Sequence, residues 1–305
     1  MAPHQLLRVV LWMSGALLAF STLAVSVRVL ATKLTVMEIL AVRAGFGICV
    51  MAGLAMFRPD LRHGIRVRHL ALHLVRNTIH LGGQWLWAMS VLLLPLATVF
   101  ALEFTAPAWT LLLAIPVLDE RITTTRLGAV VLGLAGVLVI LRPGLETFQP
   151  AALLVLTAAF AFAIALTLTK KLTRTETTFA IIFFMNLIQF PIALGASNPM
   201  SFATLEPGQI PALAAVGVTG LISHYCLANA FRSGDATVVV PLDFMRIPLI
   251  AVIGWWLYAE PLDIFVFVGA GLIVAGIFWN LRAEAARTAG VPVSHSTEKA
   301  STSTC

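Results

Sequence analysis

The order of apolar and polar residues along the chain predicts a series of membrane-spanning helices. Long apolar runs are separated by short polar or charged stretches. A helix of about 20 residues crosses the ~30 Å hydrocarbon core of a bilayer, where an open-chain segment must be helical to satisfy its own backbone hydrogen bonds. We therefore predict ten transmembrane helices, at about residues 9–29, 36–56, 71–91, 96–117, 125–141, 151–169, 178–195, 211–231, 237–258 and 264–281.

The composition agrees with an all-α polytopic membrane protein. Of the 305 residues, 59% are hydrophobic and 11% charged, and the mean hydropathy is +0.95. Soluble domains contain about 25% charged residues. The first apolar run exceeds the ~7–15 residues of a signal-peptide core, and Arg28 stands where a cleavage site would fall, so we expect this helix to be retained. Three distant cysteines, Cys49, Cys226 and Cys305, indicate neither a metal site nor a disulfide framework.

The basic residues predict the orientation. If the N-terminus is cytoplasmic and the segments alternate, only Lys33 and Arg142 fall in outer loops, and the other loop Lys and Arg residues lie inside. This positive-inside bias predicts a multi-pass protein of the bacterial cell inner membrane with both termini in the cytoplasm. It also explains the net charge of +6 without a nucleic acid partner. Residues 283–305 are rich in Ala, Ser and Thr, and we expect a disordered cytoplasmic tail.

The chain repeats itself. When residues 101–120 are laid over residues 241–260, Glu103 matches Asp243 and Glu120 matches Glu260. An odd number of helices, five, separates the matched positions, so the second half is inverted relative to the first. We predict two five-helix repeats at residues 9–144 and 150–282. Inverted repeats are characteristic of secondary transporters, in which two related halves open a central site to alternate sides of the membrane.

The ends of several helices have recognisable sequences. These are "LDERIT" after the fourth helix, "LVILRPG" after the fifth, "LTKKLTR" after the sixth and "WWLYAEPLD" between the ninth and tenth. In their order and repetition they resemble the drug/metabolite transporter (DMT) superfamily, specifically its ten-helix EamA-domain carriers, over residues 9–282. The resemblance implies a central cavity lined by helices of both halves, with no ATPase domain and no cofactor. It also implies that substrates vary widely. Many members have an uncharged residue where Glu103 stands, so a substrate cannot be copied from them.

Charged residues inside the predicted spans are the first candidates for a site. Each costs roughly 2.5–3.5 kcal/mol to insert, so such residues usually face an interior cavity. Glu103 and Asp243 lie on symmetry-matched helices and should converge near the midplane as substrate-binding groups. Asp243 alternatively pairs with Arg246, three residues away on the same helical face. Glu103 needs protonation, the substrate, or Arg76 or Arg43 to neutralise it. Arg43 pairs with Glu38 or another acid, or contacts substrate, and we treat Arg43, Arg76 and Arg246 as structural or coupling charges.

Polar and aromatic residues complete the predicted site. Asn77, His80 and Gln84 recur on the third helix at spacings of three or four, which places them on one stripe facing a wet cavity. His224 belongs to a weaker stripe on the eighth helix. Aromatic rings nearby offer stacking surfaces for a flat substrate, although packing is the commoner role for each. The predicted substrate-binding set is Glu103, Asp243, Asn77, His80, Gln84, Trp85, Phe104, Phe244 and His224.

These features predict a secondary transporter for a small organic metabolite and not an enzyme. The sequence contains no nucleophile-plus-base arrangement, metal-ligand cluster or phosphate loop. The near balance of charges in the spans suits a neutral or zwitterionic molecule. Because the resembled family includes riboflavin uptake carriers, riboflavin is the leading candidate, and export of an amino acid or related metabolite is the alternative. The partners expected are the small-molecule substrate, the lipid bilayer and a coupling proton. The sequence leaves open whether the protein is a monomer or a homodimer.

Overall fold

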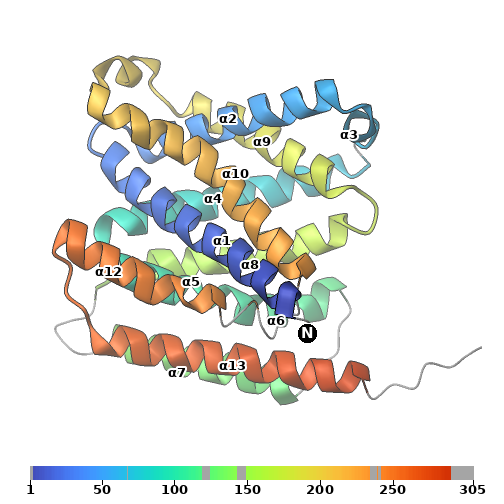
Figure 1. The fold of residues 1–305 in the computed structure, drawn as a ribbon, viewed down its shortest axis with the longest axis vertical. Coiled ribbons are helices and arrows are strands. Elements are labelled where there is room, and N and C mark those ends of the chain that lie inside the picture. The colour runs from blue at the N-terminus through green and yellow to red at the C-terminus, as the bar shows by residue number, and fades with distance from the viewer. Residues whose placement is uncertain are drawn as a thin grey trace, which may run out of the picture.

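The computed structural model describes residues 3–66, 68–118, 124–142, 149–233, 239 and 242–289, and in these ranges every regular element is a helix. Figure 1 shows their arrangement. The helices are α1 (Pro3–Leu30), α2 (Val36–Phe57), α3 (Pro59–His63), α4 (Leu70–Leu93), α5 (Leu96–Glu103), α6 (Ala106–Leu118), α7 (Thr124–Leu141), α8 (Ala152–Leu172), α9 (Thr178–Gly195), the 3₁₀ helices η1 (Pro199–Thr204) and η2 (Pro207–Gln209), α10 (Ile210–Ser233), α12 (Arg246–Tyr258) and α13 (Ile264–Ala289).

Each predicted apolar segment contains a helix. Within the described residues, seven helical stretches are long and apolar enough to cross a membrane, and the part of α7 from Leu127 to Leu141 is a shorter apolar helix. Helices α4 and α12 occupy two further predicted positions. The fold is therefore all-α as predicted, and the number of ten crossings is consistent with the structure.

The predicted fourth helix is not continuous. It breaks into α5 and α6 around Phe104 and Thr105. The reason is Pro107, whose ring conflicts with the carbonyl group four residues earlier, that of Glu103. The second half has the same feature, because α12 begins after a turn at Met245 and Pro248 follows three residues later. Both acid-bearing segments are thus interrupted close to their acidic residue. Discontinuous helices of this kind form the binding sites of many inverted-repeat transporters.

The helix pairing has the symmetry of a repeat. Helices α1, α2, α4, α5–α6 and α7 correspond in order to α8, α9, α10, the segment ending in α12, and α13. Helix α1 packs on α10 as α4 packs on α8, and α2 and α7 pack on their own counterparts, α9 and α13. In Figure 1 the α7–α13 pair forms one end of the long axis, and α2 and α9 lie toward the other.

The contacts between α7 and α13 show that the halves are inverted. A Cβ atom built on Gly269 would lie 2.5 Å from the carbonyl oxygen of Gly136, and one on Gly276 would lie 2.9 Å from that of Ala129. From the first contact to the second, the residue number rises along α13 and falls along α7, so these equivalent helices are antiparallel. Small residues permit this close approach, as is usual between membrane helices.

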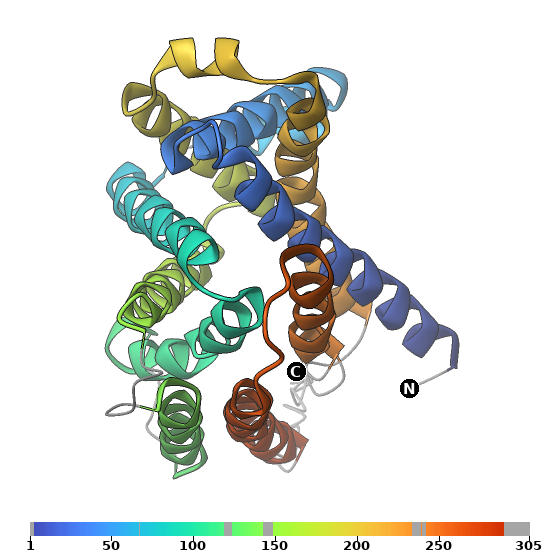
Figure 2. The ribbon, with the colours of Figure 1, turned by 90° about the vertical axis from the view of Figure 1, so that its left-hand side faces the viewer.

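The molecule has two ends in the direction of its helices. The N-terminal end of α1, helix α3 and the C-terminal end of α13 lie on one side, called here the α3 side. Helices η1 and η2 and the α12–α13 loop lie on the opposite side, called the η side (Figures 1 and 2). The first residues of α1 and the last residues of α13 therefore lie on the same side, as an even number of crossings requires.

The predicted disordered tail begins too early. Helix α13 continues through residues 283–289, where an alanine-rich stretch favours helix formation. Residues 290–305 of the predicted tail, and Glu120 of the predicted repeat, lie outside the described residues.

Candidate functional site

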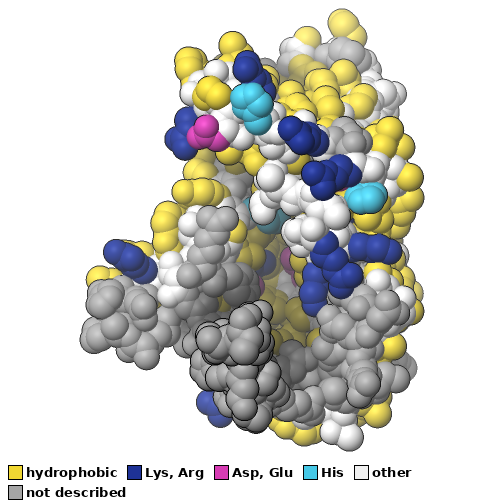
Figure 3. All heavy atoms as spheres, turned by 90° about the vertical axis from the view of Figure 1, so that its right-hand side faces the viewer, with side chains coloured by type: hydrophobic (Ala, Val, Ile, Leu, Met, Phe, Trp, Pro, Cys, Tyr) yellow, Lys and Arg dark blue, Asp and Glu magenta, His cyan; other side chains and the backbone are white. Residues whose placement is uncertain are grey.

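A cavity of about 400 Å³ lies between the two halves. Its size is within the range of small-molecule sites, about 300–1,000 Å³. On the α3 side the surface is hollowed, with Lys and Arg side chains near its rim and acidic side chains visible in its depth (Figure 3). The ionisable and amide side chains that line the cavity are Arg43, Arg76, His80, Gln84, Glu103, His224, Asp243 and Arg246, and the aromatic ones are Phe20, Trp87, Phe104 and Phe162.

Glu103 and Asp243 converge on Arg246. The Asp243 carboxylate forms an ion pair with Nη2 of Arg246, and Oε1 of Glu103 lies 3.9 Å from Nη1 of the same guanidinium. Trp87 Nε1 donates a hydrogen bond of 2.7 Å to Oε2 of Glu103. Of the alternatives that the sequence left open for Glu103, pairing with Arg76 or Arg43 is not formed among the described residues, whereas the Asp243–Arg246 pair is present. The breaks beside Pro107 and Pro248 place both acids at the cavity.

Arg246 is also enclosed by aromatic rings. Its guanidinium carbon lies 3.9 Å from the centroid of the Phe20 ring and 5.6 Å from that of Phe104. Cation–π contacts of this kind stabilise a desolvated arginine. Because only 4% of Arg246 is exposed, the acids and rings together hold its charge in place.

Arg43 and Arg76 form a second group that has no acidic partner. Arg76 donates from Nε to Thr169 Oγ1 at 3.0 Å and from Nη1 to Asn77 Oδ1 at 2.6 Å, and both acceptors are neutral. Arg43 makes no hydrogen bond or ion pair with any part of the chain that the structure describes, and its side chain lies against Gly220 of α10. The alternative pairing of Arg43 with Glu38 is not formed. Glu38 instead caps α2 through the backbone of Thr35 and accepts from the backbone N–H of Asn198 at 2.9 Å.

The polar stripe of α4 forms a network with α9. Gln189 of α9 donates to the carbonyl of Asn77 at 3.2 Å, and its Nε2 lies 3.0 Å from Nδ1 of His80. Gln84 Nε2 lies 3.1 Å from the same ring nitrogen. These contacts place Nδ1 of His80 as the acceptor of an amide N–H. His80 and Gln84 line the cavity, as does His224, whose ring meets Phe20 edge-on.

Three predicted residues do not line the cavity. Asn77 is fully buried and positions Arg76, Phe244 packs edge-on against Phe104, and Trp85 has 37% of its surface exposed on the outer face of α4. The indole at the cavity is Trp87. The sequence contained a signal for Trp87 at the cavity: it follows Gln84 by three residues and His80 by seven, and residues at these spacings lie on the same face of a helix.

Sequence reasoning also missed some cavity residues. Phe20 and Phe162 are ordinary apolar residues in the sequence, and only the packing of α1 and α8 places their rings here. Thr169 and Gln189, which orient Arg76 and His80, had no distinguishing signal of their own beyond being polar residues in apolar runs.

On the η side an ion pair joins three segments of the chain. Arg28, near the end of α1, pairs with Glu260 of the α12–α13 loop and donates to the carbonyls of Val91 and Leu94 at 2.6 and 2.8 Å. Glu260 also accepts from the backbone N–H of Leu96 at 2.8 Å. These bonds join α1, the α4–α5 turn and the α12–α13 loop.

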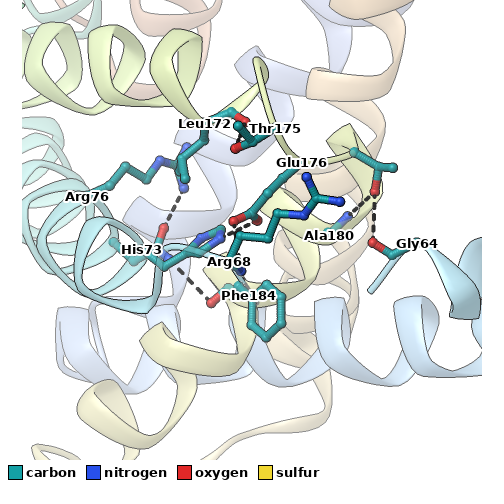
Figure 4. A network of polar contacts seen from close by, with 11 residues as sticks. Gly64, Arg68, His73, Arg76, Leu172, Thr175, Glu176, Ala180 and Phe184 are labelled. Carbon is teal, nitrogen blue, oxygen red and sulfur yellow. Dashed lines mark hydrogen bonds and ion pairs between the residues drawn. The ribbon is translucent and has the colours of Figure 1, made fainter. Parts of the chain in front are cut away.

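A separate network joins two loops on the α3 side (Figure 4). His73 Nε2 lies 2.6 Å from Oε2 of Glu176, whose Oε1 accepts from the backbone N–H of Arg68 at 3.4 Å. The Thr177 hydroxyl donates to the carbonyl of Gly64 at 3.4 Å. The loop between α3 and α4 is thereby attached to the α8–α9 loop, and none of the residues that make these loop contacts lines the cavity.

A cavity with charged and aromatic walls, placed between inverted helical halves, is the arrangement of a membrane carrier for small molecules. The sequence profile of the EamA-like transporter family matches residues 7–142 and again 149–282. The chain therefore belongs to the EamA-like transporter family, of the DMT superfamily, and is a multi-pass membrane transporter of the small-metabolite type.

Relatives of this chain have named substrates. It is similar to a riboflavin transporter of Brucella anthropi, with 26% identity over 88% of this chain and 97% of the relative. It is also similar to an S-adenosylmethionine uptake transporter of Rickettsia felis, with 23% identity over 90% of this chain and 92% of that one. A crystal structure of a protein 16% identical in sequence superposes with a TM-score of 0.61, covering 93% of this chain and 98% of the other, which supports the fold.

Proposed function

We propose that the protein is an alternating-access carrier that takes up a small, ring-bearing metabolite across the bacterial inner membrane, with riboflavin as the first candidate. The observation that carries this proposal is the central cavity, in which Trp87, Phe104, Phe20 and Phe162 offer ring faces beside the hydrogen-bonding groups of His80 and Gln84. A flat heterocycle with polar edges suits such walls. Similarity to riboflavin transporters supports the choice.

The orientation belongs to the same proposal. The positive-inside bias favours a cytoplasmic α3 side and cytoplasmic termini. In that orientation, the cavity opens to the cytoplasm and the Arg28–Glu260 pair closes the outer side. A reporter fused after Ala289 should be active only in the cytoplasm, and an extracytoplasmic signal would refute the arrangement.

A zwitterionic metabolite is the second candidate. The cavity has two separate charged regions. One contains the two acids around Arg246, and the other contains Arg43 and Arg76, which have no acidic partner among the described residues. This arrangement suits a molecule with an amino-acid portion. Similarity to S-adenosylmethionine uptake transporters supports this candidate. Export of an amino acid or related metabolite fits the same cavity in the opposite direction.

Growth of a riboflavin auxotroph tests the first candidate. Expression of the protein should allow growth at micromolar riboflavin, and the Glu103→Gln variant, expressed at a matched level, should not. Absence of rescue by a well-expressed wild-type protein would reject riboflavin uptake.

Counterflow in liposomes then distinguishes the zwitterion classes, since a carrier shows saturable exchange of labelled S-adenosylmethionine or amino acid, whereas unitary currents would indicate a channel.

A further inference from the structure

The cavity contains more positive than negative fixed charge. Three arginines line it, Arg43, Arg76 and Arg246, against the two acids Glu103 and Asp243. Both acids lie at Arg246, and Glu38 is occupied by capping α2. Among the described residues, no carboxylate is therefore placed to neutralise Arg43 or Arg76.

A charge without a counter-charge is costly inside a membrane protein. Buried charges are normally paired, and an arginine within a span usually serves a substrate or ion pathway. The partners of Arg76, Thr169 and Asn77, hold its guanidinium in one orientation but leave its charge uncompensated. Arg43 packs against Gly220, whose lack of a side chain leaves space for the arginine. A Cβ atom built on Gly220 would lie 2.9 Å from Nε of Arg43. Each of the two arginines thus has guanidinium donors that no described acid occupies.

We infer that Arg43 and Arg76 form an anion-binding subsite that takes a carboxylate or phosphate group of the transported molecule. This inference rests on the proposed carrier function and specifies its substrate class as a molecule with an anionic group; it favours the zwitterionic candidate over riboflavin, which has no carboxylate or phosphate. The planar guanidinium fork matches the two oxygens of a carboxylate or phosphate, and such charge-assisted hydrogen bonds are among the strongest in proteins. One bound carboxylate brings the count of fixed charges in the cavity to balance. The rings of the cavity are then left for the heterocyclic part of the molecule.

The first test does not depend on knowing the substrate. If Arg43 is an uncompensated cation awaiting an anion, Arg43→Met removes a cost and should raise the unfolding midpoint of the purified, ligand-free protein by about 2 °C or more. The matched control is Arg246→Met, which removes the partner of Asp243 and should lower the midpoint. A fall for Arg43→Met comparable to that for Arg246→Met would overturn the subsite, because Arg43 would then be a structural charge.

The second test uses pairs of probes that differ only in an anionic group. Riboflavin and flavin mononucleotide differ by a phosphate, and decarboxylated S-adenosylmethionine and S-adenosylmethionine differ by a carboxylate. Within at least one pair, we expect the anion-bearing probe to bind at least tenfold more tightly to the wild-type protein. Arg43→Gln should reduce that ratio by about tenfold, and Arg43→Lys, which keeps the charge but loses the fork, by less.

The outcomes separate this inference from the proposed substrates. A preference in the flavin pair identifies phosphate as the anion, and one in the other pair identifies carboxylate. If Arg43→Met is stabilised while none of the four probes binds, the named substrates are rejected and the anion subsite stands. If probes bind but the ratio in each pair is near one, or is the same in Arg43→Gln, the subsite is rejected and the carrier function remains.

Discussion

At the residue scale, the two symmetry-related acids have different local environments. Asp243 forms the close ion pair with Arg246, whereas Glu103 lies 3.9 Å from that guanidinium and accepts the Trp87 indole hydrogen bond instead. Removal of a partner from a buried pair strands the other charge, which costs about 3–5 kcal/mol when burial is complete. The two acids should therefore respond differently to neutralisation.

We predict that Asp243→Asn lowers stability more than Glu103→Gln. The Asp243 side chain is 19% exposed to the cavity, so the loss should be about 2 kcal/mol, below the ~3–5 kcal/mol of a fully buried pair. The double variant Asp243→Asn/Arg246→Met should recover the unfolding midpoint but not transport, since Arg246 lies at the cavity wall between rings. Thermal unfolding and uptake in vesicles matched for protein measure both. Equal midpoints for the two single variants would contradict the different roles.

The indole of Trp87 gives a second prediction. Trp87→Phe keeps an aromatic ring but removes the N–H that donates to Glu103 Oε2 at 2.7 Å. A hydrogen bond to a charged group contributes about 1.5 kcal/mol, so substrate affinity should fall roughly tenfold. Trp85→Phe is the matched control, because that indole is on the outer face of the same helix. A similar loss in both variants would show that ring size, and not the hydrogen bond, is what matters.

The contrast between Trp85 and Trp87 shows how far residue patterns determine the site. Helical spacing predicted a cavity stripe on the third helix, and His80 and Gln84 lie on it. Helical spacing did not predict which neighbours come from other helices. Arg246 lies near Glu103 only because the helices pack together in the tertiary structure. Periodicity predicts which residues share one face of a helix. Which charged side chains pair depends on the angles at which the helices cross, and the local sequence of an apolar helix does not determine those angles.

At the element scale, proline positions and small residues decide the shape of the helices. Apolar run lengths predicted where helices lie but treated residues 96–117 and 237–258 as continuous. Pro107 and Pro248 were visible in the sequence, yet prolines are tolerated in many membrane helices, so their presence alone does not predict a break. Glycines are similarly ambiguous: Gly136, Gly269 and Gly276 lie at tight contacts, while a side chain at Gly271 would meet nothing within 4 Å.

Two glycines of α13 therefore provide a matched test of packing. Gly269→Ala places a Cβ atom 2.5 Å from the backbone oxygen of Gly136, which cannot move aside as a side chain would. We expect a loss of about 1–3 kcal/mol in unfolding free energy, the usual cost of overpacking. Gly271→Ala, two residues away, should be neutral or slightly stabilising. Thermal unfolding in detergent compares them, and equal midpoints would mean that α7 and α13 are not in close contact.

At the scale of the whole molecule, the described conformation is asymmetric although its halves are related. The surface is hollowed on the α3 side, and on the η side Arg28 and Glu260 join α1, the α4–α5 turn and the α12–α13 loop. Inverted repeats allow the opposite arrangement when the two halves exchange conformations. If the protein works by the proposed alternating access, these η-side bonds break in each transport cycle, and their strength sets part of the balance between the two states.

Glu260→Gln should shift this balance toward opening on the η side. The variant removes the charge that binds Arg28 and weakens the acceptor for Leu96 N–H. With about 1.4 kcal/mol lost from the closed state, the open population rises roughly tenfold. A cysteine placed at Leu40, in the cavity, on a background without native cysteines, should then react about tenfold faster with an impermeant thiol reagent added from the η side.

The control for this experiment is a second ion pair on the same side. Lys33 and Glu206 lie 3.0 Å apart with side chains 38% and 68% exposed, and exposed pairs contribute about 0–1 kcal/mol. Glu206→Gln should therefore leave the labelling rate at Leu40→Cys unchanged. Because Arg28 and Glu260 are mostly enclosed and bonded to three segments, only their disruption should open the η side. If the two variants label equally fast, closure depends on the packing of α1, α5 and α12 and not on the Arg28–Glu260 pair.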